Sequence, residues 1–337
     1  MRLDSPVSKN IVVLGAGSWG GTLAQYLSEL GHSVTVWHRN RNELLTMSEK
    51  GIHPFIPEIR FPPSVTFVPE LKDLDSGDIV IIGVPSHGVR EVVEKQKIIT
   101  PGTLVLNLAK GIENETLLRM SEVISDAGQI DSGRIATLSG PSHAEEVARR
   151  VPTVVVVAGK DSHTIETIQD AISSEALRVY ANTDIVGVEL AGSVKNVIAI
   201  AAGVCDGIGF GDNTKAALII RGAVEISRLG VAMGARPETL AGLSGIGDLI
   251  VTCFSRHSRN RYVGEEIGKG RGLQEILKDM HMVAEGIQTT RAVPALAERH
   301  GVEMPICSAV HRVLFENEDP MKAVRELMTR ELGYEHQ

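Results

Sequence analysis

Cysteine is scarce in this sequence. The three cysteines among 337 residues, Cys205, Cys253 and Cys307, lie far apart, and none belongs to a Cys-x-x-Cys pair. This spacing argues against a disulfide framework and against a zinc site. We therefore expect a protein of a reducing compartment, the cytoplasm, with no bound metal.

Long apolar runs and an excess of positive charge are also missing. Apolar runs such as 154–158 and 197–202 are too short to cross a bilayer, and the polar first ten residues lack the apolar core of a signal peptide. The formal net charge of -8 is unlike the basic balance of nucleic-acid-binding proteins, although a small anion needs only a local cluster of basic groups. We expect neither membrane insertion nor nucleic-acid binding.

The two halves of the chain differ in pattern, and the length suits two domains. Short β-rich runs alternate with helical stretches up to about residue 184, which predicts a doubly wound α/β sheet. Beyond that point helical stretches dominate and no strand is predicted. The expected strands are 11–14, 34–37, 65–68, 79–84, 104–108, 135–138 and 154–157, with helices at 19–30, 91–97 and 117–126. The later helices are expected at 185–202, 214–229, 237–241, 273–278, 289–299, 308–316 and 320–329.

A glycine-rich motif follows the first expected strand. The motif Gly15-Ala16-Gly17-Ser18-Trp19-Gly20 opens a helical stretch that ends near Gly31, and a second strand comes next. In this βαβ context GxGxxG is typical of a dinucleotide-binding turn. Gly15 allows the tight turn, Gly17 lets the pyrophosphate approach the backbone, and Gly20 lets the helix pack on the strand. We therefore predict a Rossmann-type dinucleotide-binding domain at 1–184 and an all-helical, substrate-binding domain at 185–337.

The end of the second expected strand bears on which dinucleotide is bound. An NAD site usually carries Asp or Glu there, but this chain has Trp37-His38-Arg39-Asn40. Arg39 can bind a 2′-phosphate through two N–H groups. NADP is therefore favoured, with NAD as a second cofactor, and the alternative is that Arg39 is a solvated loop residue.

Two loops follow buried runs at the same predicted sheet edge, where ligands of such folds bind. One is Pro85-Ser86-His87 and the other carries Lys110-Gly111. Lys110 is well placed to meet an anion, and an ordinary surface lysine is the alternative.

The helical half holds isolated polar groups in apolar surroundings. Lys195 lies in the run VELAGSVKNVIAIAAGV, where burial would lower its pKa and suit it as a general base, unless it extends to solvent. Asp248 needs a partner, and Thr252 shares its face if the segment is helical. The segment 255–261 is a donor-rich loop that suits a phosphate ester or a carboxylate, or is merely a solvated basic loop. Its donors are Arg256, Ser258, Arg259, Asn260 and Arg261.

Seven segments in order resemble the bacterial-type NAD(P)-dependent glycerol-3-phosphate dehydrogenases. They are GAGSWG at 15–20, LAKGIE at 108–113, SGPSHAEEV at 139–147, VKNVIAIAAG at 194–203, GDLIVTC at 247–253, SRNR at 258–261 and VAEG at 283–286. The resemblance implies an oxidoreductase that interconverts glycerol 3-phosphate and dihydroxyacetone phosphate for glycerophospholipid synthesis. It also implies a helical C-terminal domain and a homodimer.

The resemblance assigns roles to individual residues. Lys195 would be the general acid and base, with Asp248 and Lys110 as further catalytic residues. The residues placed at the substrate are Lys110, Gly140, Ser142, Lys195, Asp248, Ser258, Arg259 and Asn260. With the fingerprint glycines, those placed at the dinucleotide are Gly15, Gly17, Ser18, Trp19, Gly20, His38, Arg39, Lys110, Ala144, Arg259, Val283 and Glu285.

One departure and two other interpretations stay open. The family often has an aromatic residue where this chain has His143, which either donates to the ligand or packs in its place. We assign His143 no catalytic role. A related hydroxy-acid dehydrogenase would also place a lysine on the first helix of its second domain. A non-catalytic dinucleotide sensor would leave Lys195 and Asp248 unexplained.

Overall fold

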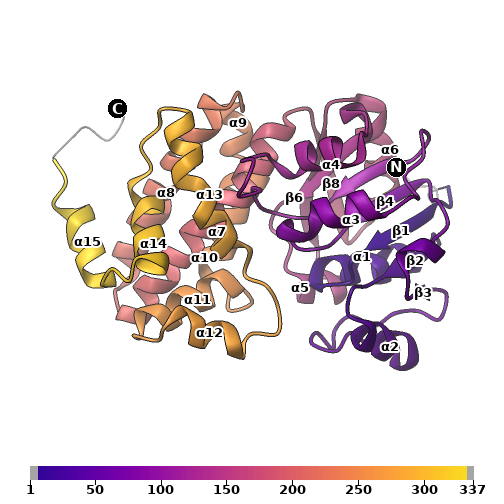
Figure 1. Cartoon of the computed structure of the whole chain (residues 1–337), viewed down its shortest axis with the longest axis horizontal. Helices are drawn as coiled ribbons and strands as arrows, with labels where there is room; N and C mark the ends of the chain where they lie inside the picture. Colours follow the sequence, from indigo (N-terminus) through magenta and orange to yellow (C-terminus); the bar gives the residue numbers. More distant parts are fainter. Residues whose placement is uncertain (1–6, 332–337) are drawn as a thin grey trace.

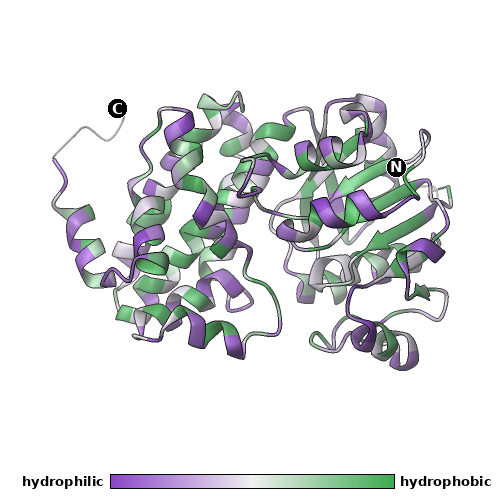
Figure 2. Ribbon diagram, in the orientation of Figure 1, coloured by the Kyte–Doolittle hydropathy of each residue, from purple (hydrophilic) through white to green (hydrophobic). Residues whose placement is uncertain are grey.

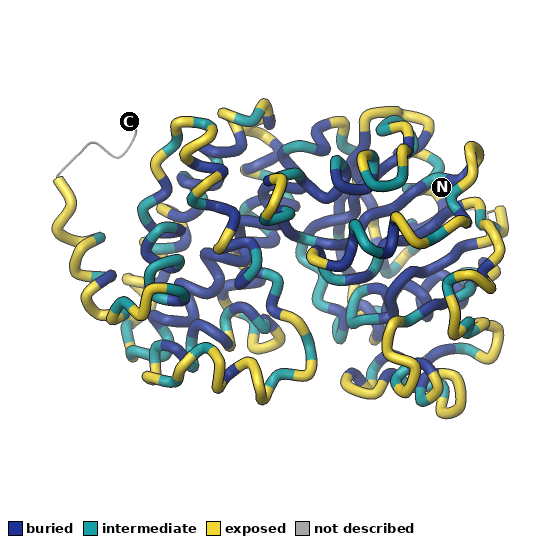
Figure 3. The backbone as a smooth tube through the Cα atoms, viewed as in Figure 1, coloured by how far each residue is buried: buried dark blue, intermediate teal, exposed yellow. Residues whose placement is uncertain are grey.

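The computed structural model describes residues 7–331, so the ends of the two predicted domains, 1–6 and 332–337, lie outside the described residues. Figure 1 shows two parts side by side, one built on a sheet with helices and the other built from helices. The strands and the centres of the helix bundle are coloured apolar in Figure 2 and buried in Figure 3. Each part therefore has a core of its own.

An eight-stranded sheet, in the order β3-β2-β1-β4-β5-β6-β7-β8, forms the first part. The strands are β1 Asn10–Leu14, β2 Ser33–Trp37, β3 Thr66–Val68, β4 Ile79–Ile82, β5 Leu104–Asn107, β6 Ile135–Ser139, β7 Thr153–Gly159 and β8 Leu177–Asn182. The order reverses between β1 and β4, which is the topological switch point where open α/β sheets bind ligands. The predicted doubly wound sheet is confirmed.

The last two strands run against the other six. β7 pairs antiparallel with β6 and parallel with β8. A continuous apolar run such as that of β7 is typical of a parallel strand, and β7 has this pairing with β8 but not with β6. The connection from Ser139 to Thr153 contains one short helix, α5, Ala144–Ala148.

Helices cover both faces of the sheet because alternate strand residues point to opposite sides. Ile11 and Val13 pack in the cluster that contains α1, whereas Val12 and Leu14 pack in the cluster that contains α3 and α4. The α-helices of this part are α1 Ser18–Glu29, α2 Arg41–Lys50, α3 Val89–Lys95, α4 Met120–Gly128, α5 and α6 Ser162–Ile172. The helix expected at 117–126 starts later, because Leu117 has a left-handed φ of 62° and turns the chain before Met120.

The helix α7, Ile185–Ile208, forms the centre of the second part, and 20 of its 24 residues are buried. By length and composition it is apolar enough to cross a membrane, but α8, α10, α11 and α13 pack around it. It is therefore a core helix of the bundle. The others are α8 Asp212–Ala232, α9 Pro237–Leu240, α10 Asp248–Phe254, α11 Arg259–Gly268, α12 Leu273–Asp279, α13 Glu285–Arg299, α14 Pro305–Phe315 and α15 Pro320–Met328. Short turns complete the fold: η1 Leu71–Asp73, η2 Ser86–Gly88, η3 Ser132–Arg134 and the π-helical η4 Leu243–Gly247.

Glycines bring α7 and α11 into backbone contact. A Cβ on Gly203 would lie 2.0 Å from the carbonyl oxygen of Arg261, and a Cβ on Gly264 would lie 1.9 Å from that of Ile200. No side chain fits at either position, so the crossing is held by the backbones themselves. Because α11 begins at Arg259, this crossing fixes the first turn of α11 relative to α7.

Candidate functional site

A cavity of about 660 Å³ lies between the carboxyl edge of the sheet and the helical part. Its size is that of a small-molecule or cofactor site. The predicted site residues that line it are Gly15, Gly17, Ser18, Trp19, His38, Arg39, Lys110, Ser142, Ala144, Lys195, Asp248, Ser258, Arg259, Asn260, Val283 and Glu285. The fold thus brings together residues that are up to 270 positions apart in the sequence.

Gly20 and Gly140 are the two predicted site residues outside the lining of this cavity. A Cβ on Gly20 would lie 2.0 Å from the carbonyl oxygen of Gly15, so Gly20 packs the helix behind the turn, as the motif predicts. Gly140 lies behind Lys110, whose Nζ donates to the Gly140 carbonyl oxygen at 3.3 Å. The Ser142 hydroxyl donates to the same oxygen at 3.0 Å.

The glycine-rich turn forms one wall of the cavity. Gly15 has a φ of +103°, and a Cβ there would lie 2.7 Å from the Val84 backbone nitrogen. The helix α1 starts after Gly17, which has no capping side chain, so its first N–H groups are left for a ligand. Trp19 Nε1 is buried and has no hydrogen-bond partner among residues 7–331. A backbone with room for phosphate and a donor without a partner fit a bound dinucleotide.

Two carboxylates from other elements lie beside the residues at the end of β2, although the sequence has no acidic residue directly after this strand. Arg39 is 64% exposed and pairs with Glu91 of α3 at 2.9 Å. His38 accepts from the Ala16 backbone N–H through Nδ1 at 3.2 Å, and its Nε2 lies 3.0 Å from Glu43. His38 therefore braces the glycine turn, while Glu43, from α2, lines the cavity itself. The sequence pattern predicted neither carboxylate here.

Asp248 holds two ammonium groups in the helical wall. Its Oδ2 accepts from Lys110 Nζ at 2.8 Å, and its Oδ1 accepts from Lys195 Nζ. Lys195 also donates to the Thr252 hydroxyl at 2.7 Å, and that hydroxyl donates to the Asp248 backbone carbonyl. The shared face of Asp248 and Thr252 is thus confirmed on α10. Lys195 is 5% exposed, so it does not extend to solvent.

Burial and charge set the protonation of this cluster. Burial lowers the pKa of Lys195 to about 8, Asp248 opposes that shift, and Lys110 adds to it. Burial alone would raise the pKa of Asp248, but the two ammonium groups outweigh burial and hold it below its usual value. Near neutral pH, Asp248 is therefore a carboxylate and Lys195 exchanges its proton readily.

The donor residues after α10 are divided between cavity and scaffold. The segment was expected to be a loop, but Arg259, Asn260 and Arg261 form the first turn of α11. Arg261 forms an ion pair with Asp206, with 2.6 Å between Nη1 and Oδ2, and neither Arg261 nor Arg256 lines the cavity. A loop was expected because Arg, Asn and Ser cluster in this segment. In the structure Ser258 is the N-cap of α11 and accepts a hydrogen bond from the Arg261 N–H, so the serine begins a helix.

Arg259 and Asn260 line the cavity beside the dinucleotide turn. Arg259 Nη2 donates to the Ser18 hydroxyl at 3.2 Å, and burial lowers its pKa, against which Glu285 and Glu145 act. Asn260 donates to Asn196 Oδ1 at 3.0 Å and accepts from the Gly286 N–H at 2.9 Å. Arg259 is thus a half-buried cation suited to an anion.

Glu285 and Ser86 join the two parts across the cavity. Glu285 accepts from the Ser86 backbone N–H at 3.0 Å and from its hydroxyl. Burial raises the pKa of Glu285. Ser86 stands in the loop after β4 that the sequence singled out, but its contact with Glu285 was not predicted.

Other cavity residues were missed. Asn196 was not predicted to line the site, although it follows Lys195 directly, and Thr252 was predicted only to share a helix face with Asp248. Phe55 stacks on His281, with ring centroids 5.2 Å apart, and no local pattern connects two residues so distant in sequence.

His143 lines the cavity near the lysine cluster. Its ring centroid lies 5.8 Å from that of His257, and its buried Nε2 has no hydrogen-bond partner in the described part of the chain. Burial, with a smaller contribution from Lys195, lowers the pKa of His143 to about 4. The imidazole is therefore neutral near pH 7.

Comparisons with known proteins extend over nearly the whole chain. The family models for the NAD-dependent glycerol-3-phosphate dehydrogenase N-terminus and C-terminus match residues 10–165 and 184–325. Glycerol-3-phosphate dehydrogenase (NAD(P)+) 2 of Salinibacter ruber is 52% identical, over 98% of this chain and 97% of that protein. The Chlorobium phaeobacteroides glycerol-3-phosphate dehydrogenase (NAD(P)+) is 50% identical, over 96% and 99%. The crystal structure of glycerol-3-phosphate dehydrogenase from Coxiella burnetii matches with a TM-score of 0.90 at 38% identity, over 96% and 99%.

Proposed function

We propose that this chain, which belongs to the NAD-dependent glycerol-3-phosphate dehydrogenase family, interconverts dihydroxyacetone phosphate and sn-glycerol 3-phosphate with NAD(P)(H). The observation that carries the proposal is the pair of lysines on buried Asp248, in the same cavity as the glycine-rich turn and Arg259. A dehydrogenase of this kind needs a site for the dinucleotide, a proton donor beside it and a group that binds the substrate phosphate. The cavity contains groups suited to each of these three tasks.

The dinucleotide would lie along the switch point of the sheet. Gly15, Gly17, Ser18 and Trp19 would hold the pyrophosphate side, with Ala144, Val283 and Glu285 further along the cavity. When bound, the dinucleotide supplies a hydride to the substrate carbonyl carbon or accepts one from the alcohol. NADP and NAD both fit the relatives' names. We favour NADP because Arg39 is exposed and can turn from Glu91 to a 2′-phosphate.

Lys195 would transfer the proton. In the reductive direction its ammonium donates to the oxygen on C2, and in the oxidative direction its neutral amine removes the hydroxyl proton. A pKa of about 8 serves both directions near neutral pH. Asp248 orients Lys195, and Lys110 adds a second positive charge where the oxygen becomes negative.

The substrate phosphate would bind Arg259 with Asn260 and Ser258. Arg259 is a half-buried guanidinium, and a phosphate ester is an anion that such a group can bind through two N–H groups. Ser142 would contact the other end of the substrate, and Gly140, behind the cavity lining, would hold Ser142 and Lys110 there through its carbonyl oxygen. Arg259 also contacts Ser18, so one side chain would couple substrate to dinucleotide.

The wider assignment follows from the same arrangement. Residues 1–184 would bind the dinucleotide, and residues 185–337 would provide most of the substrate contacts. We propose a cytoplasmic homodimer that supplies glycerol 3-phosphate for glycerophospholipid synthesis. Light scattering on the purified chain tests the dimer, which would have twice the 36.2 kDa mass of one chain.

Oxidation of NADPH at 340 nm with dihydroxyacetone phosphate, with NADH in parallel, tests the activity. Turnover with NADPH supports the reaction and the role of Arg39, whereas turnover with NADH alone supports the reaction and refutes the cofactor preference. Turnover only with 2-keto acids would indicate a hydroxy-acid dehydrogenase instead. Dinucleotide binding without any turnover would indicate a sensor. Lys195→Ala is the matched variant, which should bind NADPH and lose most of the turnover.

A further inference from the structure

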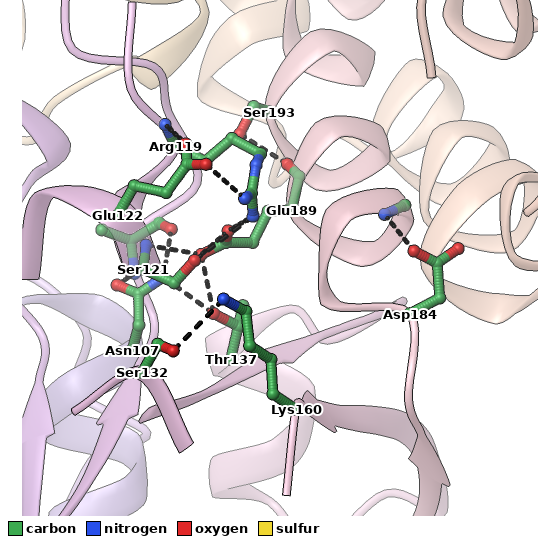
Figure 4. Close-up of polar contacts among 12 residues, drawn as sticks. Asn107, Arg119, Ser121, Glu122, Ser132, Thr137, Lys160, Asp184, Glu189 and Ser193 are labelled. Carbon is green, nitrogen blue, oxygen red and sulfur yellow. Dashed lines mark hydrogen bonds and ion pairs between the residues drawn. The ribbon is translucent and has the colours of Figure 1, made fainter. Parts of the chain in front are cut away.

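A buried carboxylate, that of Glu189, joins the first turns of α7 to the sheet part (Figure 4). Glu189 is 4% exposed and accepts four hydrogen bonds. They come from Arg119 Nη1 at 2.6 Å, the Ser121 N–H at 2.8 Å, the Ser121 hydroxyl at 2.6 Å and the Thr137 hydroxyl at 2.9 Å. All three donor residues belong to the sheet part, so Glu189 fastens α7 to the start of α4 and to β6.

The same network extends to the loop that carries Lys110. The Thr137 hydroxyl accepts from Asn107 Nδ2 at 3.3 Å, and Asn107 Oδ1 accepts from the Ala109 N–H at 3.0 Å. On the other side of Lys110, the Ser193 hydroxyl of α7 donates to the Gly111 carbonyl oxygen at 3.2 Å. Both neighbours of Lys110 are therefore tied to the Glu189 network or to α7.

We infer that Glu189 is a positioning residue for the proton-transfer site: it fixes α7 against β6 and the Lys110 loop, and so holds Lys110 and Lys195 on opposite oxygens of Asp248. The inference rests on the proposed function, because it concerns the same two lysines. Glu189 acts through these residues and does not line the cavity.

The need for such a restraint follows from charge. Lys110 and Lys195 are like charges that share one buried carboxylate, so their mutual repulsion favours an arrangement in which the less buried Lys110 moves toward solvent. Core stability alone does not require Glu189, since a buried ion pair such as Arg119–Glu189 can often be replaced by packed apolar residues without loss. A fully bonded polar network fixes one arrangement of the elements that it joins.

Loss of the Glu189 charge should therefore change the titration of Lys195. The charged and titratable groups that act on Lys195 are Asp248, Lys110, Cys253 and His143. If the Lys110 loop moves away, its positive charge no longer lowers the pKa of Lys195, and that pKa rises. Oxidation of glycerol 3-phosphate, which needs neutral Lys195, should then begin at higher pH.

Glu189→Gln tests the inference, and Glu225→Gln is its matched control. Glu225 is 3% exposed and accepts from the Ile306 and Cys307 N–H groups at the start of α14, outside the cavity. Glu189→Gln should lower kcat at pH 7 by at least about tenfold, since small misplacements of reacting groups have large effects on rate, and should leave the NADPH dissociation constant unchanged. It should also move the alkaline rise of the oxidation rate to higher pH. Glu225→Gln should change neither.

Competitive labelling with acetic anhydride, read by mass spectrometry across pH, gives the pKa of Lys195 without substrate. A rise in that pKa in Glu189→Gln alone supports the inference, even if dihydroxyacetone phosphate proves not to be the substrate. An unchanged pKa and kcat, or equal changes in both variants, would overturn it. If Glu189→Gln does not fold, Thr137→Val replaces it, because it removes one donor to the Glu189 carboxylate and the acceptor of Asn107 while it keeps the Glu189 charge. Wild-type kcat and pKa in Thr137→Val would likewise overturn the inference.

Discussion

Replacing Lys195 with methionine should stabilise the protein at pH 7, by an amount that shrinks as the pH rises. Methionine has similar length and no charge, so it removes the cost of burying an ammonium group while it keeps the packing. Asp248 keeps Lys110 as its partner in the variant. The substitution also removes the bonds from Lys195 to Asp248 and Thr252, so the change of the stability difference with pH, rather than its size at one pH, reports the titration of Lys195.

The magnitude follows from the pKa. Burial lowers the pKa of Lys195 from 10.5 to about 8, which corresponds to about 3 kcal/mol of lost stability when the group is charged in both states. Between these pH values the unfolded chain binds more protons than the folded one, so wild-type stability rises with pH. The loss of wild-type stability caused by the charged Lys195 is fully present below about pH 8 and disappears above about pH 10.5.

Urea unfolding of both proteins at pH 7, 8, 9 and 10, at constant ionic strength, measures this difference. Groups that titrate alike in both proteins cancel, so the free energy of unfolding of wild type minus variant should increase by about 2–3 kcal/mol from pH 7 to pH 10. Circular dichroism at each pH checks that both proteins start folded. A difference that stays flat, or that decreases with pH, would refute the claim that burial dominates the titration of Lys195.

Three further substitutions address the ends of the cavity. Glu91→Gln should lower the KM for NADPH a few-fold and leave the KM for NADH unchanged, because it frees Arg39 from its ion pair. Arg39→Gln should raise the KM for NADPH by about tenfold, which corresponds to the loss of one charged hydrogen bond. Equal effects on the KM values of both dinucleotides would count against a contact between Arg39 and a 2′-phosphate. Arg259→Met should raise the KM for dihydroxyacetone phosphate by about 10- to 100-fold and abolish any thermal stabilisation by inorganic phosphate, and a phosphate effect that survives the substitution would place the phosphate elsewhere.

Local signals in the sequence predicted much of the fold. The turn at Gly15 and the strands on either side of α1 were predictable because a tight turn, a helix start and a buried strand each depend on neighbouring residues. The strand β8 was missed, although Leu177 and Val179 are buried and Arg178 and Tyr180 exposed, the period of two of a half-covered strand. The alternation could have predicted β8 from the sequence, but it extends over only four residues.

The pairings across the site were not predictable from local patterns. Lys195 and Asp248 each stood out as a charge in an apolar segment, but no local pattern shows that they meet each other and Lys110. The pair of Arg39 and Glu91 joins two elements whose approach depends on the twist of the whole sheet. The burial of a residue can be predicted from its neighbours in the sequence, whereas the residue that it contacts depends on the topology of the whole fold.

Under the proposed roles of Lys195 and Arg259, the contact between Gly203 of α7 and the backbone of α11 would set the length of the substrate. Lys195 lies on α7 and Arg259 on α11, so the distance between the proposed proton donor and the proposed phosphate-binding group depends on a helix crossing with no adjustable side chain. Changes in the cavity lining can alter which groups the substrate carries along that span. A longer phosphorylated alcohol would therefore not fit between these two groups unless α11 shifted against α7, which the backbone contact at Gly203 and Gly264 opposes.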